Sequence, residues 1–127
     1  MSGVLVLDND LEHIQHLQKA LAGVPVRTVH AANQWVEAAR HGHWNYIFLN
    51  DCAQTGAYVC AWAAEHIEKF NGTVFIVLAK DPATAKRMSG LLRRAHLHVH
   101  LKPRAGEDTT LMRQICEHLK RVSPGSV

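Results

Sequence analysis

The sequence predicts an α/β domain in which five buried parallel strands alternate with five helices. Two features of the chain favour this fold class. Short apolar runs such as residues 4–7 and 46–49 contain no polar residue, as expected for strands that are covered on both faces. The segments between such runs place apolar residues three and four positions apart, which is typical of amphipathic helices. This alternation favours a doubly wound parallel sheet with right-handed crossovers.

Five segments have the composition of strands. They are residues 4–7, 24–30, 46–49, 73–78 and 97–101. The run at 46–49, Tyr-Ile-Phe-Leu, is the clearest candidate for a central strand, because helices cover the central strands of a parallel sheet on both faces.

Five segments have helical periodicity. They are residues 11–21, 31–40, 58–70, 82–95 and 111–122. Glycines at 23, 42 and 72 supply stop signals after the first three helices. Asp81 and Pro82 place a capping residue and a first-turn proline at the start of the fourth helix.

The length of 127 residues suits a single domain, 1–127, with a core over about residues 3–122 and a short polar tail at 123–127. Hydrophobic residues make up 47% and charged residues 20% of the chain, which excludes a disordered protein. No apolar run approaches the roughly 20 residues of a membrane helix. The three cysteines form no CxxC pair, which favours reduced thiols, and we expect a cytoplasmic protein.

Polar residues follow three of the expected strands at their carboxyl ends. They are Asp8-Asn9-Asp10, Asn50-Asp51 and Lys102-Pro103. The carboxyl ends of parallel strands meet at one edge of the sheet, where α/β proteins bind ligands. The layout is that of an acidic, phosphoryl-accepting pocket, but an amide, Asn50, stands at its centre.

With these features the chain resembles the receiver domain of bacterial response regulators over about residues 3–122. Residues 4–10 are similar to the first strand and acidic turn of that family, and residues 46–50 to the third strand, which ends in the phosphoacceptor aspartate. Val77-Leu78-Ala79 stands where the family has a strand ending in Thr or Ser, and Leu101-Lys102-Pro103 matches its lysine-proline ending. The resemblance implies a flavodoxin-like strand order, 2-1-3-4-5, and a role in two-component signalling or a phosphorelay.

The resemblance also identifies what this chain lacks. A receiver accepts a phosphoryl group on a carboxylate with the help of magnesium, which its acidic residues hold. Here Asp8 and Lys102 are kept, whereas Asn9 replaces an acid that contacts the metal, Asn50 replaces the nucleophile and Ala79 removes the hydroxyl. The expected protein is a pseudo-receiver, which is not an enzyme, binds no cofactor or metal and signals through protein–protein interaction independently of phosphorylation.

Asp51 provides the main alternative, a conventional phosphoacceptor receiver. A shift of one residue would place Asp51 at the acceptor position, and weak Mg²⁺ binding is expected only if Asp51 takes part. Strand alternation argues against this, because Asn50 and Asp51 should point to opposite faces.

The fourth helix and fifth strand provide a candidate interaction surface. Its residues are Lys86, Arg87, Arg93, Arg94, His98 and His100. By resemblance, the face formed by the fourth helix, fifth strand and fifth helix would bind a signalling protein or a second copy of this chain. No membrane contact is expected. A basic nucleic-acid-binding regulator is a further alternative, although the sequence has no separate recognition helix and only 6% aromatic residues.

Three histidines, His96, His98 and His100, alternate along the expected fifth strand and should share one face. Neighbours in such a row lie about 6.6 Å apart, which is long for a shared metal ion. We therefore interpret the row as the polar face of an edge strand, and a pH-sensitive dimer surface is the other interpretation.

Overall fold

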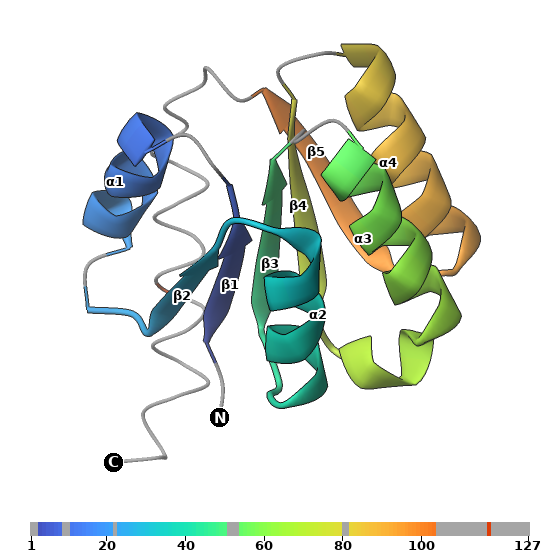
Figure 1. Cartoon of the computed structure of the whole chain (residues 1–127), viewed down its shortest axis with the longest axis horizontal. Helices are drawn as coiled ribbons and strands as arrows, with labels where there is room; N and C mark the ends of the chain where they lie inside the picture. Colours follow the sequence, from blue (N-terminus) through green and yellow to red (C-terminus); the bar gives the residue numbers. More distant parts are fainter. Residues whose placement is uncertain are drawn as a thin grey trace.

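The computed structural model describes residues 3–8, 11–21, 23–50, 54–79, 82–103 and 117 (Figure 1). Its centre is a five-stranded sheet with the order β2-β1-β3-β4-β5, in which every neighbouring pair is parallel. The predicted fold class and strand order are therefore confirmed.

The strands and helices alternate along the chain as predicted. The elements are β1 Val4–Leu7, α1 Leu11–Ala20, β2 Val26–Val29, α2 Ala32–Arg40, β3 Tyr46–Asn50, α3 Gln54–Glu65, the 3₁₀ helix η1 Ile67–Phe70, β4 Val74–Ala79, α4 Pro82–Arg94 and β5 His98–Pro103. The predicted fifth helix, 111–122, falls almost wholly outside the described residues. No described helix is both long enough and apolar enough to cross a membrane.

Helices cover both faces of the sheet, with α2, α3 and α4 on one face and α1 on the other (Figure 1). The residues of β1 alternate between the two faces, as the pleat of a strand requires. Leu5 and Leu7 join the core beneath α2, α3 and α4, whereas Val4 and Val6 pack with Leu17 of α1. All four residues of β1 are fully buried, which explains its uninterrupted apolar sequence.

Aromatic rings fill the larger core, beneath α2 and α3. Trp35 of α2 is fully buried and lies 5.9 Å from Phe70 and 5.8 Å from Trp62 between ring centroids. Phe70 in turn meets Phe75 of β4 edge-on at 5.2 Å. Edge-to-face contacts of this kind add to the burial of the rings, so this cluster fixes η1 against the sheet.

The helix predicted at 58–70 differs from the observed one at both ends. It begins earlier, at Gln54, and its α-helical part stops at Glu65, before the separate turn η1. The imidazole of His66 explains the stop, because its Nδ1 donates to the Trp62 carbonyl at 2.8 Å and its ring stacks on the Trp62 indole at 4.0 Å. The side chain thus satisfies a carbonyl at the helix end, where the backbone no longer supplies a donor.

The predicted histidine row is wrong at its first member. His96 lies before β5, in the turn that follows α4, and has a left-handed φ of 63°. It therefore does not continue the alternation of His98 and His100 along the strand. The sequence did not predict this turn, because a left-handed backbone conformation is usually expected at glycine and not at a residue with a Cβ such as His96. β5 itself is an edge strand, as predicted.

Two threonines with opposite hydrogen-bonding states test this description of the core. Thr73 is buried and its hydroxyl donates to the Trp44 carbonyl at 2.6 Å, whereas the buried hydroxyl of Thr28 in β2 has no partner among the described residues. Thr73→Val should lower the free energy of unfolding by about 1–2 kcal/mol, because the Trp44 carbonyl loses its donor. Thr28→Val should be neutral or stabilising, because it removes an unsatisfied polar atom. Urea denaturation of both variants measures the difference, and an equal loss of stability would contradict it.

The thiol of Cys60 in α3 gives a second test of the core. Burial raises the pKa of Cys60 to about 12 from its usual 9.0. Only the thiolate reacts with alkylating agents, so iodoacetamide at pH 8 should modify Cys60 about a thousandfold more slowly in the folded protein than in urea. The unfolded chain ionises first as the pH rises, so the contribution of this group to stability is complete below pH 9 and is lost towards pH 12. Peptide mapping of Cys60 by mass spectrometry measures both rates, and equal rates would show that the thiol is accessible.

Candidate functional site

The strand register places the predicted pocket residues at one level of the sheet. In β3, β4 and β5, Asn50 pairs with Leu78 and Leu78 pairs with Lys102. Leu7, the last residue of β1, pairs with Leu49, so Asp8 stands one position further, level with Asn50. The backbones of Asn50 and Lys102 are separated by β4, which corresponds to two strand spacings, or about 9.6 Å. The carboxyl edge therefore carries an acid, an amide and a lysine in register.

Asp8 is held firmly at this edge. It is fully buried, and its backbone N–H donates to the Val29 carbonyl at 3.1 Å. Its own carbonyl lies 2.8 Å from Nδ1 of His30. A carbonyl can only accept, so Nδ1 of His30 carries the hydrogen. The backbone at Asp8 is thus tied to the last residue of β2 and to the first residue after it.

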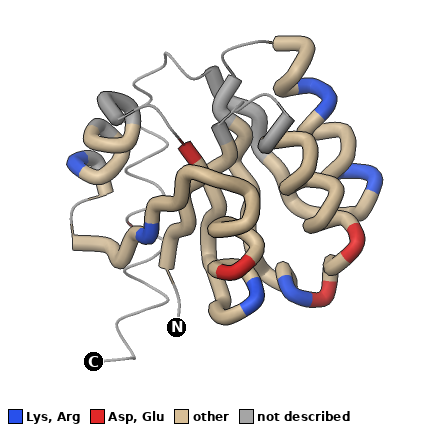
Figure 2. Tube along the Cα trace, in the orientation of Figure 1, with Lys and Arg blue, Asp and Glu red and all other residues tan. Residues whose placement is uncertain are grey.

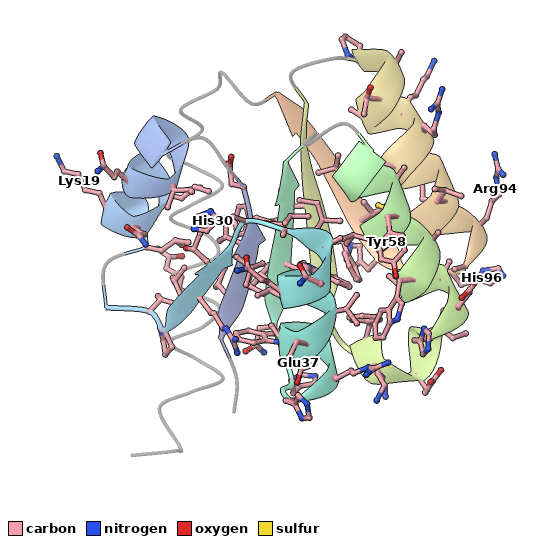
Figure 3. All side chains as sticks on the ribbon, viewed as in Figure 1. Lys19, His30, Glu37, Tyr58, Arg94 and His96 are labelled. Carbon is pink, nitrogen blue, oxygen red and sulfur yellow. The ribbon has the colours of Figure 1, made fainter. Side chains whose placement is uncertain are left out.

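His30 is a residue of this edge that the sequence interpretation did not select. It follows Val29, the residue that pairs with Leu7, and so stands level with Asp8 on the far side from Asn50. Its backbone N–H donates to Oε1 of Gln34 in α2 at 2.9 Å, and Figure 3 shows His30 near the end of β2. The signal that could have found it is its position at a strand end, where Asp8 and Asn50 were found.

The remaining pocket predictions are described in part. Asn9 and Asp51 lie outside the described residues, and Asn50, Ala79 and Lys102 are described in their backbone alone. The register shows that Leu78, and not Ala79, is the β4 residue level with Asn50 and Lys102, while Ala79 pairs with Pro103. Neither Leu78 nor Ala79 has a hydroxyl group. The end of β4 therefore lacks a hydroxyl group, whether Leu78 or Ala79 is taken as the residue at this level.

Within the described residues, this edge provides a magnesium ion with a single carboxylate. Magnesium is bound by hard oxygen ligands, commonly one or two carboxylates. Asp8 is the carboxylate that the structure describes here, while the residue level with it in β3 is the uncharged Asn50. Among the described residues, no group of three or more His, Cys, Asp or Glu side chains is placed to hold a metal ion.

The candidate interaction surface lies on α4 and β5. Its four basic residues, Lys86, Arg87, Arg93 and Arg94, are exposed on α4. Figure 2 shows the basic positions of α4 on the outer side of the molecule, and Figure 3 shows Arg94 pointing away from the sheet. His98 is exposed on β5, whereas the side chain of His100 lies outside the described part. The structure therefore brings the four cations and His98 to neighbouring elements.

Comparisons with known proteins bear on the fold. No protein-family model matches the sequence, and no curated protein matches it. Solved structures do match. The receiver domain of DrrB in its BeF3-activated form has a TM-score of 0.65 at 14% identity, over 95% of this chain and 100% of that one. The receiver domain of a signal transduction histidine kinase from Syntrophus aciditrophicus has a TM-score of 0.66 at 16% identity, over 94% and 93%.

A third match, an adenylate cyclase structure from Rhodopirellula baltica, has a TM-score of 0.65 at 13% identity and covers 97% of this chain. At these identities the likeness concerns the backbone arrangement and not the residues of the site. Together with the strand order β2-β1-β3-β4-β5, it shows that this chain adopts the receiver-domain fold.

Proposed function

We propose that this protein is a receiver-like signalling module that acts by binding another protein, independently of phosphorylation. The observation that carries the proposal is the position of Asn50 at the end of β3, where it is level with the buried Asp8 that follows the neighbouring strand β1. The pocket edge thus keeps an acid and a lysine but has an amide in the central strand. We infer that the fold is retained for its surfaces and not for phosphoryl transfer.

Elementary chemistry supports this proposal. Phosphoryl transfer to a receiver requires a carboxylate oxygen as nucleophile and a cation that neutralises the developing charge. The lone pair of an amide nitrogen is delocalised, so Asn50 is a very poor nucleophile. Replacing carboxylates with amides at Asn9 and Asn50 also removes two negative charges from a site that would need them to bind magnesium.

The proposed binding surface is the exposed face of α4 together with β5. The cations of α4 and the exposed His98 support it, because they form a concentrated basic surface beside an edge strand. The partner we propose is a signalling protein or a second copy of this chain. Charges of this kind steer association more than they strengthen it, so binding through this face should be transient and sensitive to salt.

Incubation with acetyl phosphate and Mg²⁺ tests the independence from phosphorylation. The intact mass should stay unchanged, because no carboxylate occupies the level of Asn50 in β3. Asp51→Ala is the matched variant, since Asp51 is the acid next to Asn50 in the sequence. A phosphoryl adduct on the wild type that disappears in Asp51→Ala would support the conventional receiver and overturn the proposal.

Restoring the missing carboxylates gives the reverse test. Asn9→Asp combined with Asn50→Asp should create Mg²⁺ binding that is at least about tenfold tighter than in the wild type, because two charges return beside Asp8. Isothermal titration calorimetry measures the affinity, and each single variant should give a smaller gain. Asn33→Asp on the exposed surface of α2 is the control for added charge alone. A double variant that binds Mg²⁺ no better than this control would show that the edge is no remnant of a metal site.

A further inference from the structure

The exposed face of α4 is organised into two rows of cations on either side of a seam of small residues. Ala83 and Gly90 lie seven residues apart and mark the seam. Lys86 and Arg93 form one row, and Arg87 and Arg94 form the other. With 3.6 residues per turn, each row lies about 40–60° from the seam, and the two members of a row stand about 10.5 Å apart along the axis.

The charge of this face is of one sign. α4 contains no Asp or Glu between Pro82 and Arg94, and Figure 2 shows no acidic position on it. Within the part of the chain that the structure describes, none of the four cations has an ion-pair partner. The buried side of the same helix is apolar, with Ala85, Met88 and Leu92 in the core. The cations are therefore presented to solvent without neutralisation inside the described structure.

The seam allows a second helix to approach α4 closely. Gly90 has no side chain, and a Cβ placed there would meet no atom within 4 Å, so the space above it is open. Small residues at a helix contact let two backbones come close, as they do where helices pack at Gly and Ala. A helix lying on Ala83 and Gly90 would have one cation row along each of its sides.

From this arrangement we propose that α4 recognises an acidic α-helix that lies along the seam and carries carboxylates on both flanks. The inference rests on the proposed function and specifies the chemistry of its partner. The geometry corresponds to that of paired helices in which charges on both sides of a narrow contact select the partner and its orientation. Since α4 is about 20 Å long, the interface is small and the complex is transient.

Two observations favour an acidic helix over nucleic acid on this face. No aromatic residue lies in α4, so bases have no platform on which to stack. Glu65 ends α3, the helix packed beside α4, and Glu68 follows in η1. A nucleic-acid duplex long enough to contact both cation rows would extend beyond the C-terminal end of α4 towards these carboxylates. An acidic α-helix of the same length as α4 would not.

A pair of synthetic peptides tests the proposal. The first is a capped, alanine-based helix of about 21 residues that carries Glu on both sides of an Ala stripe only over its central part, which matches α4 in length, and the second has Gln at the same positions. Fluorescence anisotropy of the labelled peptides at low salt should show at least about tenfold tighter binding of the Glu helix to the full chain. A third peptide with the same number of Glu residues and two central prolines cannot form the helix, and it should bind at least about threefold more weakly than the first.

Variants of the protein assign the binding to the two rows and the seam. Lys86→Glu with Arg93→Glu, and separately Arg87→Glu with Arg94→Glu, should each weaken binding of the Glu helix about tenfold. Lys69→Glu, an exposed lysine of η1, is the matched control and should leave it unchanged. Gly90→Leu should weaken binding by blocking the seam, whereas Gly90→Ala should preserve it.

The proposal is overturned if the Gln or the proline peptide binds as well as the Glu helix, if reversal of either row has no effect, or if Gly90→Leu binds like the wild type. Tighter binding of a 20-base-pair DNA duplex than of the Glu helix would identify the face as a nucleic-acid site and would also overturn it. These outcomes leave the phosphorylation test unaffected, because that test depends on the carboxyl edge of the sheet and not on α4.

Discussion

The parallel register of the five strands is the constraint on which the rest of the structure depends. Because every neighbouring pair is parallel, all strands end at the same edge, and backbone pairing alone brings residues from distant parts of the sequence level with one another. The sheet in turn is stable only while helices cover both faces, since its central strands, β1, β3 and β4, are apolar on both sides. The burial of β1 and the alignment of Asp8, Asn50 and Lys102 are thus two results of one arrangement.

This arrangement separates the requirements of the fold from those of the chemistry. A carboxamide and a carboxylate have almost the same shape, so Asn50 can end β3 without disturbing the register or the core beneath it. The amide differs from a carboxylate in having no negative charge and no nucleophilic oxygen. The surface of α4 is independent of that difference, because its cations stand on the outer side of a helix whose inner side packs against the sheet.

The layers were predicted from apolar periodicity, which is strong in residues 4–7 and 46–49, whereas the strand order was implied by the resemblance to receiver domains. Prediction errors arose where one side chain determined the backbone. The ring of His66 ends α3 by donating a hydrogen bond to the Trp62 carbonyl. His96 adopts a left-handed backbone conformation, which a histidine in the sequence does not predict. At the carboxyl edge, the positions of the strand ends predicted that Asp8, Asn50 and Lys102 gather at one edge of the sheet, but the contact between His30 and the Asp8 carbonyl depends on a tertiary hydrogen bond that no local pattern encodes.

That hydrogen bond also connects two strands beyond the last pair of their ladder. β1 and β2 pair as far as Leu7 and Val29, and the ring of His30 contacts the Asp8 carbonyl one position further on. The backbone of Asp8 is thereby bonded through both its N–H, to Val29, and its carbonyl, to His30. The position of the buried aspartate therefore depends on a side chain that follows the outermost strand, although the two residues lie far apart in the sequence.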